Sequence, residues 1–202
     1  MTLYLGIPED SGIDWGDFRS FAIQKNLTTW LSSCGIGPVS VKIVGKAQPQ
    51  MTPSDGLVYL LGDPSDSIVS RVGAPESQEL HIGQTSALRG EMISEVYVNP
   101  LHVYGISATV YHELLHNKFR LAVDIHRIAD GNFTSAVAPY TEGGPSDGDQ
   151  KLMAQALQQN ARQFQGGFTA ARPCTSSGSS NRIASLRSRT ASSPMRSRPG
   201  FS

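Results

Sequence analysis

Residues 106–121 read ISATVYHELLHNKFRL, and the absence of proline and glycine from this stretch predicts a helix. Within it, His112, Glu113 and His116 form the pattern HExxH. Residues four apart lie on one face of a helix, so both imidazoles can point at the same metal ion. Glu113 lies one step round from His112 and can face a water bound to that ion. Because two imidazole ligands with an open position suit Zn²⁺, the stretch predicts a zinc centre.

The HExxH pattern is specific for a chain of this composition. Five histidines and seven glutamates in 202 residues give about 0.004 matches by chance. Leu114 and Leu115 point away from the imidazoles and can anchor the helix in the core. The alternative interpretation is that both histidines are exposed or hydrogen-bonded residues of an ordinary amphipathic helix.

The rest of the chain alternates between helical and strand patterns. Apolar residues recur close to the helical period over residues 14–34 and alternate as in a half-buried strand over residues 39–44. The other elements expected are a buried strand over 57–61, a helical turn over 67–72, a strand over 95–98 and a helix over 149–164. A helix followed by strands and then by helices predicts an α+β domain.

The composition changes near Gly166-Gly167. Residues 1–150 hold all 17 acidic residues and nine basic ones, for a net charge of −8, whereas residues 151–202 hold eight basic residues and none acidic, for +8. Residues 174–202 contain 10 serines and five arginines but only isolated apolar residues, too few to offset the entropy of ordering. We therefore expect one domain over 1–167 and a disordered, flexible, basic Ser/Arg-rich tail over 168–202.

The charge of the tail is compatible with an acidic partner, but a solvated tail or an export or docking segment is the favoured interpretation. No aromatic residue is interleaved with its arginines to stack on bases, so nucleic acid is the less favoured partner. No apolar run is long enough to span a membrane, and Met1–Pro8 lacks the pattern of a secretory signal. We expect cytoplasmic synthesis and no membrane partner, with export that uses no cleaved leader left open.

The segment Tyr111–Asn117 resembles the zincin metallopeptidases, the HExxH superfamily, and the resemblance extends loosely over residues 95–120. It implies a zincin-like fold with a small mixed sheet and an HExxH active-site helix. It also implies that His112 and His116 are zinc ligands and that Glu113 is the general base. In that superfamily the strand before the helix commonly lies at the edge of the sheet and binds extended peptide, which implies a peptide or protein substrate.

The resemblance leaves the third protein ligand open. The metzincin pattern HExxHxxGxxH requires a glycine where this chain has Phe119 and a histidine where it has Ala122, so the standard metzincin pattern is excluded. His126 follows at a distance that lets the helix end and the chain turn back, and it is the ligand we expect. Glu142, in a loop rich in glycine and proline, and Asp124 are the alternatives.

These expectations together predict a zinc-dependent protease. Zinc would bind a water, Glu113 would take its proton, and the hydroxide would attack a peptide carbonyl that the metal polarises. Tyr111 or Tyr140 could supply a phenol to the oxyanion. Two alternatives stay open: a non-catalytic zincin-shaped binding or assembly protein with structural zinc or none, and metal-dependent hydrolysis of a substrate other than a peptide.

Overall fold

The structure, a computed structural model, describes most of the predicted domain. It covers residues 1–9, 11, 13, 17–45, 49–71, 82–88, 91–99, 101–120, 122–127, 130–134 and 143–165. The tail expected over residues 168–202 lies outside the described residues.

A five-stranded mixed sheet forms one layer of the fold. Its strands are β1 (Thr2–Gly6), β2 (Ser40–Val44), β3 (Gly56–Leu61), β4 (Gly83–Leu88) and β5 (Glu91–Tyr97). The strand order is β2-β1-β3-β5-β4, and every neighbouring pair is parallel except β4 and β5. The mixed sheet agrees with the prediction, but the predominance of parallel pairs makes this an α/β fold where α+β was expected.

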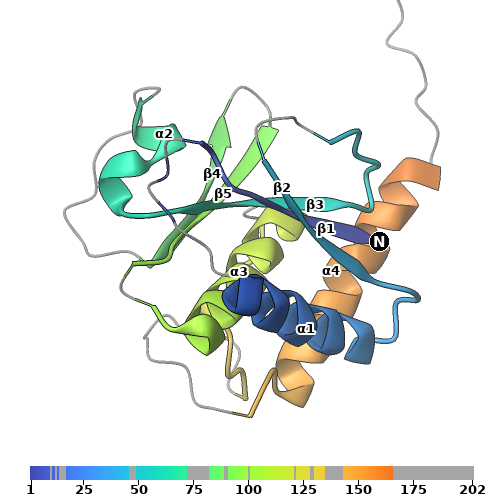
Figure 1. Cartoon of the computed structure of the whole chain (residues 1–202). Helices are drawn as coiled ribbons and strands as arrows, with labels where there is room; N and C mark the ends of the chain where they lie inside the picture. The colour runs from blue at the N-terminus through green and yellow to red at the C-terminus, as the bar shows by residue number, and fades with distance from the viewer. Residues whose placement is uncertain are drawn as a thin grey trace, which may run out of the picture. The chain divides into compact units, whose positions relative to one another are not determined.

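Three long helices lie together on one side of the sheet (Figure 1). They are α1 (Asp17–Ser33), α3 (Val103–Phe119) and α4 (Asp147–Gln165), and a short α2 (Ile68–Arg71) lies between β3 and β4 in the chain. Two single 3₁₀ turns, Pro64–Asp66 and Ile125–Arg127, complete the described elements. The four helical segments predicted from the sequence are confirmed, with shifts of a few residues at their ends.

The core lies between this helical layer and the sheet. On β1, Leu3 and Leu5 point to the same face and are fully buried. On α1, Ile23, Leu27 and Leu31 recur every four residues and belong to the same buried cluster. Burying each such side chain stabilises the fold by about 1.5–3 kcal/mol, so this contact fixes α1 on the sheet.

Helix α3 has defined ends that differ slightly from the predicted ones. The Nδ1 atom of His102 accepts a hydrogen bond from Gly105 N at 3.0 Å and caps the first turn. Arg120 adopts a left-handed conformation, with φ of 51°, and ends the helix. The helix therefore runs from Val103 to Phe119 instead of 106–121. Its two expected anchors are fully buried, as predicted: Leu114 and Leu115.

Two strands were not predicted, and one was misplaced. β1 lies at the start of the chain, and β4 is a polar strand whose sequence is GQTSAL. The strand expected over 95–98 begins at Glu91 and lies between β3 and β4. It is therefore an interior strand, and the edge position that the resemblance implied for it belongs to β4.

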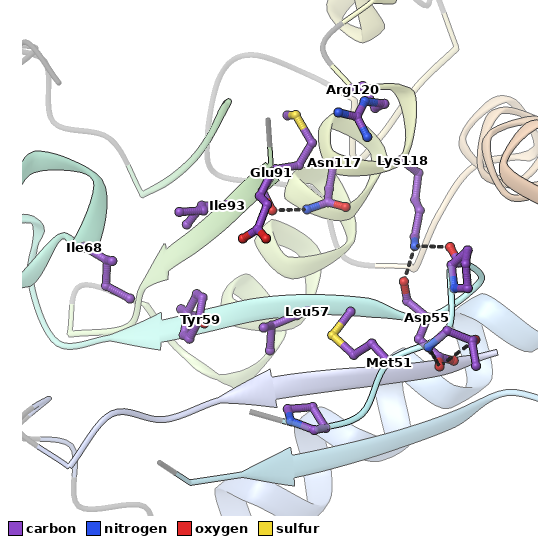
Figure 2. Close-up of a pocket in the computed structure, with 14 residues that line it drawn as sticks. Met51, Asp55, Leu57, Tyr59, Ile68, Glu91, Ile93, Asn117, Lys118 and Arg120 are labelled. Atoms are coloured by element: carbon purple, nitrogen blue, oxygen red, sulfur yellow. Dashed lines mark hydrogen bonds between the residues drawn. The ribbon is translucent and has the colours of Figure 1, made fainter. Parts of the chain in front are cut away.

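Strands β3 and β5 separate at one end, and side chains of α3 lie at the gap (Figure 2). The two strands pair only from Tyr59 with Glu95 onward, which leaves their preceding residues without each other as partners. There, Asn117 Nδ2 donates to Met92 O at 3.3 Å, and Lys118 Nζ donates to Asp55 O. These bonds satisfy strand carbonyls beside a cavity of about 580 Å³.

Burial of Lys118 at this gap disfavours its charged form and lowers its pKa to about 8. The backbone carbonyls of Pro53 and Asp55, just before β3, nevertheless accept hydrogen bonds from its ammonium group. None of the described residues that line the cavity is a histidine. The cavity is therefore distinct from the HExxH residues.

A buried carboxylate joins α2 to the sheet. Glu95, which has no exposed surface, accepts from the backbone N–H groups of Ile68 and Val69 at 2.8 and 3.1 Å. It also accepts from Ser67 Oγ, Gln84 Nε2 and Tyr97 Oη at 2.7 to 3.1 Å. A carboxylate at the start of a helix satisfies otherwise unpaired N–H groups, so Glu95 fixes α2 in place.

We expect Glu95→Ala to lower the free energy of unfolding by about 3 kcal/mol, because it leaves several buried donors without an acceptor. Urea unfolding followed by circular dichroism measures the change. Glu91→Ala, an exposed position of the same strand, is the control and should stay within about 0.5 kcal/mol of the parent. A loss below about 1 kcal/mol for Glu95→Ala would contradict the prediction.

Candidate metal centre

Three histidines from two segments converge beside α3. Their potential ligand atoms all lie within 4.8 Å of one another. The ring centroids of His112 and His116 are 4.9 Å apart, and those of His126 lie 5.0 and 5.1 Å from them. The first two are one helical turn apart on α3, and the 3₁₀ turn Ile125–Arg127 brings the third to them. Within the part of the chain that the structure describes, this is the only such group.

The segment Asp130–Thr134 orients two of the three rings. His112 Nδ1 lies 2.6 Å from Phe133 O, and His126 Nδ1 lies 3.2 Å from Thr134 O. Since a carbonyl oxygen can only accept, each Nδ1 must carry the proton. The Nε2 atom of each ring is then the nitrogen that carries the lone pair, which is the atom that can bind metal.

His116 provides a second sign of a ligand site. Its Nδ1 atom is buried, and it has no hydrogen-bond partner among the described residues. A buried polar atom without a partner costs free energy, and native structures rarely keep one without a reason. A metal ion in the centre of the cluster fits this chemistry, because it needs an unprotonated imidazole.

Burial keeps the two helical histidines neutral. It lowers the pKa of His112 to about 4, and burial together with the neighbouring His112 lowers the pKa of His116 to about 4. Both are therefore neutral at pH 7. His126, by contrast, is exposed, so solvent reaches the cluster from its side.

Glu113 is buried against the edge strand. Thr85 Oγ1 of β4 donates to Glu113 Oε2 at 2.7 Å. A Cβ atom on Gly83, two residues earlier, would lie 2.8 Å from Glu113 Oε1, so the strand approaches the carboxylate this closely only because residue 83 is glycine. Burial raises the pKa of Glu113 to about 8. A carboxyl group with a raised pKa is typical of general bases.

The alternative ligands lie apart from the cluster or outside the description. Asp124 accepts from His126 N at 3.2 Å and forms an ion pair with Arg127 at 2.9 Å, and its carboxylate is not part of the three-histidine group. Glu142 and Tyr140 lie outside the described residues. Tyr111 is fully buried, and its hydroxyl donates to Asp149 O, so it belongs to the core.

The sequence did not reveal the residues that support the centre. Phe133 and Thr134 act through backbone carbonyls, which have no sequence signature. Thr85 lies on a polar edge strand whose pattern was too weak to predict. Gly90, just before Glu91, was a turn signal in the sequence that could have suggested a further strand before β5.

Among the described residues, no helix has the length and apolar character needed to cross a membrane.

We expect Glu113→Gln to stabilise the metal-free protein increasingly as pH rises. The pKa of Glu113 is raised in the folded state, so the unfolded chain, whose Glu pKa is about 4.3, loses this proton first. The carboxyl group therefore costs stability as pH rises from about 4.3 to 8. Glutamine has the same shape and does not titrate, and it should raise the unfolding midpoint by about 2 °C or more at pH 8.

Thermal unfolding at pH 5 and pH 8 in a chelator measures the difference between variant and parent. Every other titratable group is common to both proteins, so its contribution cancels in the difference. Glu91→Gln, on the exposed end of β5, is the control and should follow the parent at both pH values. A Glu113→Gln difference that is equal at pH 5 and pH 8 would show that the carboxyl group is not perturbed.

No protein-family model matches this chain, and no curated protein matches it either.

Proposed function

We propose that this chain is a zinc-dependent peptidase with a zincin-like fold. The convergence of His112, His116 and His126 carries the proposal, because three imidazoles with one side open to solvent are a ligand set for catalytic zinc. The HExxH pattern contributes two of the ligands, and the third was expected from the sequence.

The donor atoms fit zinc after a small movement. Zn–N bonds of about 2.0 Å place tetrahedral nitrogens roughly 3.3 Å apart, and the ligand atoms here lie within 4.8 Å of one another. An all-imidazole set suits zinc better than Mg²⁺ or Ca²⁺, which take oxygen ligands. Zinc bound at such a site lowers the pKa of water to about 7 and polarises a carbonyl group.

Glu113 supplies the general base in this proposal. It follows His112 directly on α3, and its carboxylate accepts a hydrogen bond from β4. The hydrogen bond from Thr85 Oγ1 occupies Oε2 and leaves Oε1 for a proton. Glu113 takes a proton from the attacking water and returns it to the departing amine.

The position of β4 favours a peptide as substrate. β4 is the antiparallel edge of the sheet, and among the described residues it pairs only with β5. Gly83 and Thr85 of this strand contact Glu113, so an extended chain added to its free edge would pass the general base. Edge strands bind extended peptides through main-chain hydrogen bonds.

We expect about one zinc per chain by elemental analysis at pH 7, and less than about 0.1 in His112→Ala, His116→Ala and His126→Ala. Asp124→Ala and Glu142→Ala should retain zinc. His102→Asn, which keeps a good helix cap outside the cluster, is the matched control. Loss of zinc in Glu142→Ala, with zinc retained in His126→Ala, would show that Glu142 is the third ligand and His126 is not.

Glu113→Gln should retain zinc and lose about 10²–10⁴-fold in peptide hydrolysis, the usual contribution of a general base. Cleavage of a library of internally quenched peptides measures the rate, and Glu91→Gln is the control. Equal rates in Glu113→Gln and the parent would overturn the mechanism. Stoichiometric zinc without cleavage of any peptide would favour the non-catalytic binding or assembly protein.

A further inference from the structure

We infer that Asp149, at the start of α4, is the positioning residue of the metal centre. Its carboxylate holds the backbone of residues 132–134, and that backbone orients His112 and His126. The inference rests on the proposed function, because it takes the imidazoles to be metal ligands. It concerns a residue that touches neither a ligand ring nor a substrate.

The carboxylate of Asp149 is fully buried and accepts five hydrogen bonds. Oδ2 accepts from the backbone N–H groups of Asn132, Phe133 and Ser146 at 2.8, 2.9 and 2.9 Å. Oδ1 accepts from the backbone N–H and the hydroxyl of Thr134 at 3.2 and 3.0 Å. A carboxylate has about four lone-pair positions, so these five hydrogen bonds use its full capacity as an acceptor.

Capping of α4 explains only one of these bonds. Ser146 N donates to Asp149, and Asp149 N donates to Ser146 Oγ at 3.1 Å, which is a reciprocal capping box. The other four donors come from residues 132–134, which are distant in sequence from the helix end. A cap alone needs none of them, so the site is built around this loop.

The geometry of one peptide bond transmits the position of Asp149 to His112. The N–H of Thr134 and the C=O of Phe133 belong to the same planar trans peptide and point in opposite directions. Asp149 Oδ1 accepts from that N–H, and His112 Nδ1 lies 2.6 Å from that C=O. Fixing one end of the peptide therefore fixes the other. The negative charge also polarises the peptide and makes its oxygen a stronger acceptor.

The loop has little room to adopt another arrangement. A Cβ atom on Gly131 would collide with Thr134 Oγ1 and lie 3.1 Å from Asp149 Oδ1. A Cβ atom on Gly148 would likewise collide with the side chain of Asp130. The side chains of Thr134, Asp149 and Asp130 thus fill the space that a Cβ atom at either glycine would need, so the loop and the first turn of α4 pack closely.

The test compares Asp149→Asn with Ser146→Ala in the full chain. Asparagine keeps the shape but loses the charge and one acceptor, whereas Ser146→Ala weakens the same helix cap and leaves the loop bonds in place. We expect Asp149→Asn to raise the Kd for Zn²⁺ by 10–100-fold, the usual effect of disturbing a ligand's supporting contacts. Ser146→Ala should lower the unfolding midpoint but change the Kd by less than about twofold.

A metal-free measurement separates this inference from the proposed function. Nitrogen-15 NMR of the imidazoles should show His112 and His126 protonated on Nδ1 in the parent, and a mixture of tautomers in Asp149→Asn. If the parent binds no zinc, the proposed function fails, and the tautomers still decide the role of Asp149. Unchanged tautomers, or a Kd within twofold of the parent, would overturn the inference.

A milder variant covers the case in which Asp149→Asn does not fold. Thr134→Val removes one of the five bonds and keeps the backbone ones, so we expect a Kd raised about threefold and a partial tautomer change. Asp147→Asn, an exposed carboxylate in the same helical turn, is the matched control and should equal the parent. A Thr134→Val protein that equals the parent in both readouts would overturn the inference.

Discussion

Helix α3 is enclosed, so its polar side chains must find their partners inside the protein. Thirteen of its 17 residues are buried, because the sheet and the other long helices surround it. A polar side chain on such a helix needs a partner, and most have one. Thr109 Oγ1 donates to Gly105 O, Asn117 to a carbonyl of β5, and Lys118 to carbonyls beside β3. Against this background, Nδ1 of His116, which has no partner in the part of the chain that the structure describes, is an exception that points to a ligand.

The sequence predicted the parts of the fold that depend on local pattern. The helices have the right period or composition, and the HExxH spacing by itself predicts that His112 and His116 lie together, as they do. The position of His126 also agrees with the expectation, although its role as a ligand stays a prediction. Strand β4 was missed because edge strands are often polar and short, and tertiary pairing decides their structure.

The supporting contacts of the centre could not be predicted for a different reason. Asp149 reads in the sequence as an acidic residue at a helix start, which is where such residues are common. Nothing local distinguishes it from Asp147, which is exposed. The difference arises only when residues 132–134 fold back over the helix end, and a long-range contact of this kind leaves no periodic signal in a single sequence.

Phe133 packs its ring in the core and directs its backbone carbonyl at the histidine cluster. The ring contacts Trp30, Tyr104 and Tyr111, with centroids 4.8 to 6.1 Å away, while its carbonyl oxygen faces His112. The loop therefore cannot swing away without exposing an aromatic side chain, at a cost of about 2–3 kcal/mol. The contacts that orient His112 and His126 are then lost only by local unfolding of the aromatic core, a rarer event than the fluctuations of a free surface loop.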